Sequence, residues 1–289
     1  MIMRNRLPAW LKQDLPDNSV KELREQLKSG DIHTVCQEAR CPNINSCFKQ
    51  HTATFLILGD RCTRSCTFCA VKKASCGVAA DPGEPARIAC SVRKMGLDYA
   101  VITSVTRDDL VDGGARIFVD TVARLRDYLP KIRIELLIPD FKGEREIIKA
   151  IVDANPDLIA HNLETVSRLY PFVRPQADYN RSLQVLKLIK EFNPAMVTKS
   201  SLILGLGESS EEVIGAMREL KASGCDILVL GQYLRPSAGN YPVKRFLFPS
   251  EFDELAELAK TMGFRKALCA PKARSSFQAS SIYGELNYA

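Results

Sequence analysis

The sequence lacks any long apolar run. No hydrophobic stretch approaches the roughly 18 residues needed to span a bilayer, and residues 1–19 contain no continuous apolar core of the kind that a signal peptide carries. Aromatic residues make up only 7% of the chain, and no basic stripe interleaved with aromatic side chains is present, which argues against nucleic-acid binding. We therefore expect a cytoplasmic protein that binds neither a membrane nor a nucleic acid.

Internal repeats and low-complexity segments are also absent. The 289 residues are 46% apolar, enough to bury the core of one large domain or two ordinary ones. The net charge of +6, from 40 Lys and Arg against 34 Asp and Glu, is spread along the chain. A mildly basic surface of this kind suits an acidic protein partner.

Histidine is scarce and cysteine is abundant. We expect the three histidines, His33, His51 and His161, to make structural hydrogen bonds. Ten cysteines in a large chain without a secretion signal argue for metal or redox chemistry and against a disulfide framework. Six of them form two groups, the N-terminal triplet (Cys36, Cys41 and Cys47; C-x4-C-x5-C) and the loop triplet (Cys62, Cys66 and Cys69; C-x3-C-x2-C).

The rest of the chain alternates between two patterns. Runs rich in Val, Ile and Leu predict strands at 53–59, 99–105, 132–138, 158–163, 198–204 and 226–231. Apolar residues spaced by three and four predict helices near 84–95, 113–128, 143–154, 180–192, 209–222 and 250–261. Six strand–helix units predict an α/β fold with parallel strands, namely a partial (βα)6 barrel of the TIM type, with an open doubly wound sheet as the alternative.

Three segments follow from this pattern. Residues 1–52 are expected to form an N-terminal extension, residues 53–262 the barrel and residues 263–289 a C-terminal tail. Within the extension, a helix is expected to begin with a capping box between Ser19 and Glu22 and to stop at Gly30. A second capping box, between Ser209 and Glu212, is expected at the fifth barrel helix.

The loop triplet directly follows the first predicted strand. Carboxyl ends of strands carry the chemistry of βα barrels, and three soft thiolates in a short loop suit either zinc or an iron–sulfur cluster. The spacing alone leaves the two metals equally open. In a four-iron cluster, three cysteines leave one iron free for a ligand that is not protein.

This loop, with Phe68 before its last cysteine, resembles that of the radical S-adenosylmethionine (SAM) superfamily. The stretches "CQEARCPNINSC", "TATFLILGDRCTRSCTFCAV", "HNLETV", "LILGLGE", "GQYLRPS" and "ARSSF" are similar to signature stretches of lipoyl synthases, and the resemblance runs from about residue 34 to 278. The sequence departs from the usual family residues at Phe48, Asn240, Lys272 and Phe277.

The resemblance implies two 4Fe–4S clusters and SAM as cofactors. In that family, the cluster on the loop triplet chelates and cleaves SAM to form a 5'-deoxyadenosyl radical. The cluster on the N-terminal triplet is an auxiliary cluster that supplies two sulfur atoms to carbons six and eight of a protein-bound octanoyl-lysine. We therefore expect a lipoyl synthase, an enzyme of the sulfurtransferase type. The alternatives are a biotin-synthase-like radical enzyme and, in a different class, a non-catalytic zinc or iron–sulfur protein.

The family also implies partners. These are an octanoylated lipoyl carrier domain or glycine-cleavage carrier protein as substrate, a small-protein electron donor and iron–sulfur assembly factors. Contacts to SAM are expected from residues at the ends of predicted strands, although turn and helix-start roles are open for several of them: Phe68, Ser104, Thr106, Asn162, Glu164, Gly205 and Gly207.

One ligand of the auxiliary cluster is missing from the N-terminal triplet. By chemistry alone, Cys269 is the obvious soft ligand. The resemblance points instead to a serine of "ARSSF", and we choose Ser276 over Ser275. A hard oxygen on a soft iron site is a weak link, which suits a cluster that must give up sulfur.

Overall fold

The structure of the protein is a computed structural model that describes residues 7–13 and 15–286. The outermost parts of the expected extension and tail lie outside these residues. In the described chain, none of the helices is long and apolar enough to cross a membrane.

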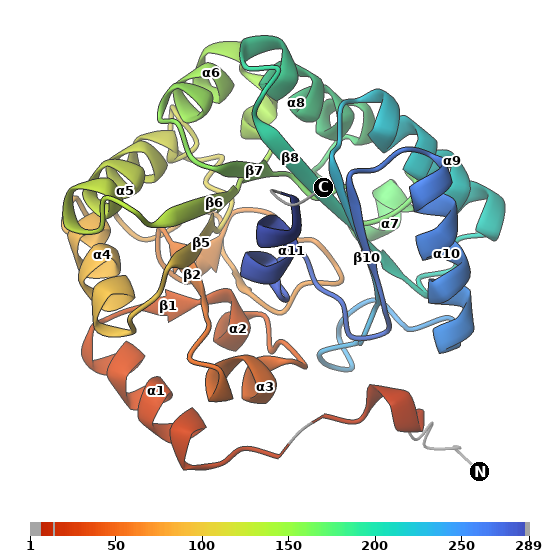
Figure 1. Cartoon of the computed structure of the whole chain (residues 1–289), viewed down its shortest axis with the longest axis horizontal. Coiled ribbons are helices and arrows are strands. Elements are labelled where there is room, and N and C mark those ends of the chain that lie inside the picture. Colours follow the sequence, from red (N-terminus) through yellow and green to blue (C-terminus); the bar gives the residue numbers. More distant parts are fainter. Residues whose placement is uncertain (1–6, 14, 287–289) are drawn as a thin grey trace.

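One curved sheet forms the centre of the molecule (Figure 1). Its strand order is β1-β2-β5-β6-β7-β8-β9-β10, and every neighbouring pair except β1–β2 is parallel. The strands are β1 (His33–Thr34), β2 (Thr54–Ile57), β5 (Tyr99–Ser104), β6 (Arg133–Leu137), β7 (Leu158–Ala160), β8 (Val197–Leu204), β9 (Ile227–Gln232) and β10 (Lys266–Cys269). The six predicted strands are confirmed, and the partial barrel is the observed architecture.

Six helices cover the outside of the sheet, each in the crossover between two parallel strands or after β9 (Figure 1). They are α4 (Glu84–Lys94), α5 (Ala115–Tyr128), α6 (Arg145–Asp153), α8 (Tyr179–Phe192), α9 (Ser210–Ala222) and α10 (Pro249–Thr261). Their apolar faces are buried against the strands, as the spacing of three and four predicts. The capping box of Ser209 and Glu212 at the start of α9 is confirmed.

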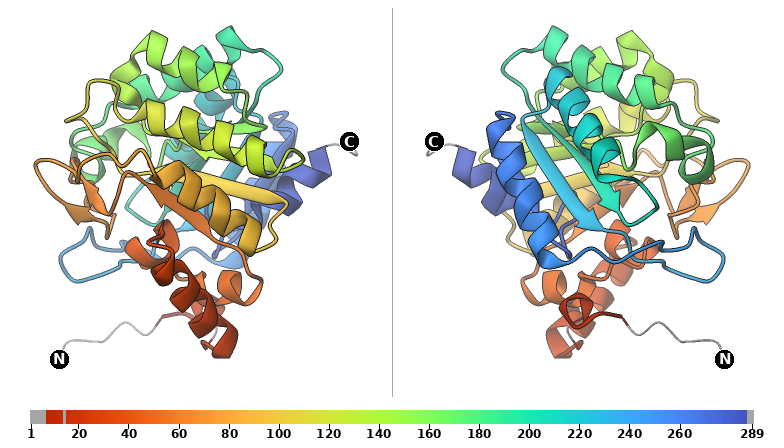
Figure 2. Two further views of the ribbon diagram at one scale, coloured as in Figure 1. Left: turned by 90° about the vertical axis from the view of Figure 1, so that its left-hand side faces the viewer. Right: turned by 90° about the vertical axis from the view of Figure 1, so that its right-hand side faces the viewer.

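The N-terminal extension consists of α1 (Asn18–Ser29), β1, α2 (Val35–Glu38) and α3 (Ile44–Lys49), which lie beside β2 (Figure 2). Val20, Leu23 and Leu27 of α1 join the same buried core as Phe48 of α3. The predicted capping box of Ser19 and Glu22 is wrong. Asp17 has the extended backbone of a cap residue and accepts a hydrogen bond from the Val20 amide, so the helix begins before Ser19 can cap it.

Shorter elements lie around the open end of the barrel. β3 (Arg61–Cys62) and β4 (Lys72–Lys73) form a two-stranded parallel sheet that encloses the loop triplet. Short helical turns at η2 (Phe141–Gly143), η3 (Ser167–Leu169) and α7 (Tyr170–Val173) follow β6 and β7, and η1 (Ala9–Leu11) precedes α1.

The C-terminal segment is more than a tail. β10 is a seventh parallel strand that the pattern did not predict, because "KALC" is not a run of Val, Ile and Leu. The chain then returns through residues 270–278 to α11 (Ala279–Glu285), which lies inside the ring of strands (Figure 1). Ile282 and Leu286 pack against Leu158 and Ile227, two strand residues whose side chains face the barrel interior. The C-terminal segment therefore fills one end of the barrel.

Candidate active site

Two adjoining cavities lie at the carboxyl ends of the strands. The first, here the N-terminal cavity, has a volume of about 210 Å³ and is lined by the whole N-terminal triplet together with Ser275 and Ser276. The second, here the loop cavity, has a volume of about 250 Å³ and is lined by the whole loop triplet. Phe68, Cys69, Asn162 and Glu164 line both, so the fold brings the two triplets to opposite sides of one shared wall.

Most of the N-terminal cavity is apolar. Leu202 and Ile203 of β8, Val229 of β9 and Leu234 just after β9 contribute to its lining, as does Leu137 at the end of β6. Such a lining suits a hydrocarbon chain, because burying apolar surface from both partners is favourable and no polar group is left unpaired.

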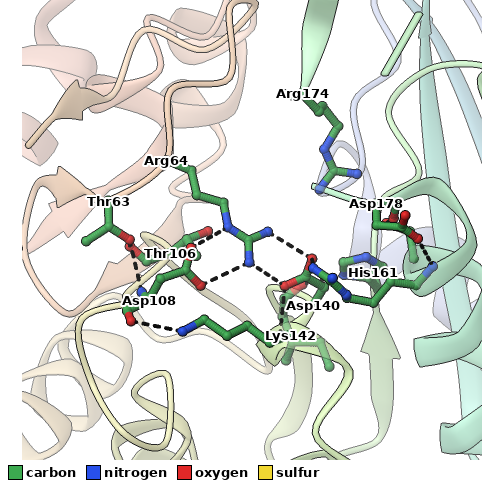
Figure 3. A network of polar contacts seen from close by, with 12 residues as sticks. Thr63, Arg64, Thr106, Asp108, Asp140, Lys142, His161, Arg174 and Asp178 are labelled. Carbon is green, nitrogen blue, oxygen red and sulfur yellow. Dashed lines mark hydrogen bonds and ion pairs between the residues drawn. The ribbon is translucent and has the colours of Figure 1, made fainter. Parts of the chain in front are cut away.

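The loop triplet is held by a network of hydrogen bonds and ion pairs (Figure 3). Arg64, between the first two cysteines, donates paired hydrogen bonds to both Asp108 (2.7 and 3.0 Å) and Asp140 (2.9 and 2.6 Å). Although burial opposes it, the Arg64 guanidinium holds the pKa of Asp140 well below its usual range. Thr63 adds bonds from its amide and hydroxyl to the Thr106 carbonyl. The cysteine loop is thereby fixed to the loops after β5 and β6.

A second anchor comes from the segment after β9. The Asn240 side-chain amide donates to the carbonyls of Thr67 (3.1 Å) and Cys69 (3.0 Å), and Ser237 donates to the Asn240 side-chain oxygen at 2.7 Å. Asn240 is one of the departures from the family that the sequence resembles, in which histidine is common at this position. An amide offers two donors at one nitrogen, whereas a neutral imidazole offers only one.

Burial disfavours the thiolate form of several cysteines. It raises the pKa of Cys36 and Cys69 to about 12 and that of Cys47 to about 11. A cationic centre such as iron would reverse this, because coordination stabilises the thiolate directly. In the described residues, no three Cys, His, Asp or Glu side chains gather around one point where a single metal ion could sit. The cysteines line the cavity walls instead.

Buried polar atoms without partners line the loop cavity. Ser104 Oγ, His161 Nε2 and Arg174 Nε make no hydrogen bond within the part of the chain that the structure describes. His161 Nδ1 is 2.9 Å from the Ile138 carbonyl, which can only accept, so Nε2 is left as a bare acceptor. Burial lowers the pKa of His161 to about 4 and keeps the ring neutral. Unpaired buried groups are costly. The Ser104 hydroxyl and the His161 Nε2 acceptor fit an amino group, and the Arg174 cation fits a carboxylate. The three together suit an amino-acid ligand such as the methionine part of SAM.

Asn162 and Glu164 form the centre of the shared wall. Asn162 Nδ2 donates to Glu164 Oε1 at 3.0 Å, and Arg174 donates to the Asn162 carbonyl at 3.0 Å. Burial raises the pKa of Glu164. Glu164 also has a positive φ of 68°, which a non-glycine residue adopts at a cost. Its backbone bonds to Ser201 and Ile203 of β8 maintain this conformation.

The C-terminal segment delivers its serines to the N-terminal cavity. Ser275 Oγ donates to Asn162 Oδ1 at 2.9 Å, whereas Ser276 lines the cavity without a side-chain bond of this kind in the described chain. Cys269, in β10, does not line this cavity. Its thiol is buried, which raises its pKa to about 12.

Most of the other predicted contacts also reach a cavity. Phe68, Ser104, Thr106, Asn162 and Glu164 all line the loop cavity. Gly205 and Gly207 line neither cavity, and their turn packs against Gln232, Lys244 and the Arg245 carbonyl. Their approach to an adenine ring stays a prediction.

Sequence reasoning missed three arginines. Arg64 could have been singled out from the sequence, since it is the only long side chain between the first two cysteines of the loop triplet. Arg274 belongs to the signature stretch "ARSSF", in which only the serines were singled out. Arg174, in the loop after α7, carried no signal, because a lone arginine in a polar loop is normally solvated. Arg174 is only 9% exposed, and Arg274 lines the N-terminal cavity.

Comparison with known families gives two matches along the chain. Residues 56–220 match the radical SAM superfamily, and residues 2–41 match the N-terminal domain of lipoyl synthase of the radical SAM family.

Curated relatives match over almost the whole length. The chain is 50% identical over 277 residues to the lipoyl synthase of Rubrobacter xylanophilus, covering 96% of this chain and 86% of that protein. It is 48% identical to the lipoyl synthase of Caldicellulosiruptor saccharolyticus, covering 96% and 98% of the two chains.

Among solved structures, methylornithine synthase aligns with a TM-score of 0.56 at 13% identity, covering 96% of this chain and 90% of that one. Streptococcus suis SuiB bound to S-adenosylmethionine aligns with a TM-score of 0.55 at 13% identity, covering 83% and 52%. At such low identity, these likenesses establish the fold alone.

Proposed function

The chain belongs to the lipoyl synthase family of the radical SAM superfamily, and on that premise we propose how its two cavities share the reaction. The enzyme inserts two sulfur atoms at carbons six and eight of an octanoyl-lysine on a carrier protein. The observation that supports this most directly is the pair of adjoining cavities, each lined by one complete cysteine triplet.

In our proposal, the loop triplet holds a 4Fe–4S cluster with one iron open to SAM. When bound, this pair supplies an electron and a carbon-centred radical that removes hydrogen from unactivated carbons, which no general base could deprotonate. The protein positions the cofactor. Arg174 offers its unpartnered Nε to the carboxylate of SAM, and Ser104 and His161 offer their free atoms to the amino group. Arg64 and Asn240 keep the loop itself in place.

The N-terminal triplet and Ser276 would hold the auxiliary cluster, which the reaction consumes as its sulfur donor. Two observations support Ser276 over the alternatives. The hydroxyl of Ser275 is engaged by Asn162, and Cys269 lies outside the lining of the N-terminal cavity.

The octanoyl chain is proposed to lie in the apolar N-terminal cavity. Because Phe68 and Cys69 line both cavities, a chain in this position has the loop cavity on one side and the N-terminal triplet on the other. The apolar lining also keeps water away from a reactive carbon radical.

Several partners complete the proposal. The substrate carrier is either a lipoyl carrier domain or the glycine-cleavage carrier protein. A small protein supplies electrons, and iron–sulfur assembly factors rebuild the auxiliary cluster. None of the ten cysteines, all of which lie in the described residues, forms a disulfide, and we place the reaction in the cytoplasm, where thiols stay reduced.

The test is anaerobic reconstitution with iron and sulfide, followed by incubation of an octanoyl-lysine peptide with SAM and a reductant. Mass spectrometry should detect peptide in which two hydrogens have been replaced by two sulfurs. The control omits SAM. Peptide of unchanged mass in the presence of both intact clusters would overturn the proposal. Zinc in place of iron would favour a non-catalytic metal protein.

A further inference from the structure

The segment that carries the serine pair is attached to three distant parts of the fold. The Gln232 amide at the end of β9 donates to the Pro271 carbonyl at 3.1 Å. Asn43, inside the N-terminal triplet, donates to the Lys272 carbonyl at 2.7 Å, across 229 residues of sequence. Ser275 donates to Asn162 at 2.9 Å. The first two bonds hold the segment beside the N-terminal cavity. The third joins it to Asn162, which also lines the loop cavity.

The bonds from Ser275 and to Glu164 together fix the Asn162 amide. The Glu164 carboxylate accepts from Asn162 Nδ2, which decides between the two amide orientations, and the Ser275 hydroxyl, by donating to Asn162 Oδ1, holds the amide in that position. Ser275 is 7% exposed, so no bulk water competes for this bond. Ser275, Asn162 and Glu164 thus form one chain of hydrogen bonds.

This chain crosses from one cavity to the other. Ser275 lines the N-terminal cavity but not the loop cavity, whereas Asn162 and Glu164 line both. Arg174, whose Nε is free in the loop cavity, also donates to the Asn162 carbonyl. A shift of the C-terminal segment would therefore move Asn162, and with it the residues that line the loop cavity.

We propose that Ser275 is a positioning residue that couples the docking of the C-terminal segment to SAM binding through Asn162. The inference rests on the proposed function, since it assigns the loop cavity to SAM. It predicts that a side chain outside the loop cavity sets the affinity for SAM. Coupling of this kind is reciprocal, so SAM binding also favours the docked segment and hence the place of Ser276.

The experiment is a double-mutant cycle on the holoenzyme with both clusters reconstituted. The dissociation constant of SAM is measured from the change that SAM causes in the electron paramagnetic resonance signal of the reduced loop-triplet cluster. Ser275→Ala and Asn162→Ala are each expected to weaken binding about fivefold, the value of one neutral hydrogen bond. The double variant should be no weaker than Asn162→Ala alone, because the two residues act through one bond.

Two variants serve as controls. Ser275→Thr keeps the hydroxyl and should restore the wild-type affinity, and Ser280→Ala removes an exposed serine of the neighbouring helix α11 and should change nothing. If Ser275→Ala does not fold, Ser275→Cys keeps a similar volume with only a weak donor and should also weaken binding.

Hydrogen exchange gives an independent readout. SAM should slow exchange of the amides of residues 273–277 in the wild type and not in Ser275→Ala. Unchanged SAM affinity in Ser275→Ala, or losses that add in the double variant, would overturn the inference. A wild-type enzyme that binds SAM with this coupling but makes no lipoyl product would overturn the proposed function alone.

Discussion

Gly231 occupies the point where the C-terminal segment passes closest to the sheet. A Cβ at this position would lie 2.0 Å from the Ala273 carbonyl oxygen and 3.1 Å from Arg274 Nη1. Ordinary contact begins at 3.4 Å, so in Gly231→Ala the Ala273 carbonyl must retreat by about 1.4 Å. The φ angle of Gly231 is not in the left-handed region, so alanine introduces no other strain there.

Moving the segment by this distance has two expected effects. Overpacking of this kind lowers the free energy of unfolding by about 1–3 kcal/mol. It also displaces Ser276, two residues beyond the contact site on Arg274, so lipoyl formation should fall steeply. Cleavage of SAM at saturating concentration should persist, since the loop triplet is untouched.

The assay compares three measurements on each variant: urea unfolding, 5'-deoxyadenosine released and sulfur gained by the octanoyl-lysine peptide. Gly215→Ala in helix α9 is the matched control, because its Cβ would meet nothing within 4 Å. That change should raise stability by about 0.5–1 kcal/mol and leave both activities as they are. A Gly231→Ala enzyme with wild-type stability and full lipoyl formation would refute the close-approach reasoning.

Four further outcomes are expected. Alanine at any member of the loop triplet should abolish 5'-deoxyadenosine formation, whereas alanine in the N-terminal triplet should leave some cleavage but no sulfur insertion; lipoyl product from the latter variants would show another sulfur source. Ser276→Ala should keep cleavage and lose most lipoyl product, while Cys269→Ala should be nearly silent in the same peptide assay; the reverse pattern would make Cys269 the ligand. Asn240→Asp removes both donors to the loop carbonyls, so it should lower the iron content and alter the resonance signal of the loop cluster, with Asn240→His milder; identical spectra would argue against this anchor. Because burial lowers the pKa of His161 to about 4, the unfolded chain binds a proton at higher pH than the folded one, and stability should fall as pH drops from about 6.5 to 4, by about 2 kcal/mol at pH 5. Urea unfolding of the apoprotein should show this slope, and His161→Gln should flatten it.

The barrel was predictable because its strands and helices have regular apolar patterns. The strand at 132–138 and the helix at 143–154 each ended within two residues of β6 and α6. β10 was not predictable in this way, since four half-buried residues carry no periodicity and the strand is specified by its pairing with β9. The capping residue was predicted as Ser19 for a similar cause. Asp17 can also accept from the first amides of the helix, and only the extended backbone at Asp17 shows that it is the cap.

The residues of the candidate site also fall into a group that sequence patterns indicate and a group that only the fold brings together. Cysteine spacing and the family resemblance indicated both triplets and the serine pair. Contacts made across long sequence separations were not visible, such as Ser275 with Asn162 and Asn240 with the loop carbonyls. Arg174 was missed for a different reason, since its contact with Tyr170 is local but no sequence pattern shows that this loop folds back on the Tyr170 ring.

The insertion of α11 into the barrel has a consequence for the order of assembly. The three cysteines of the loop triplet lie within eight residues, so their site requires little chain closure and can form while the polypeptide is still being made. The proposed auxiliary site joins segments as far apart as Asn43 and Lys272, and its last wall is residues 273–277, which directly precede α11. Because domains fold from the N-terminus during synthesis, the N-terminal cavity is completed after the loop cavity. On the proposed assignment, a chain that ends before residue 273 would contain the loop triplet but lack the last wall of the N-terminal cavity.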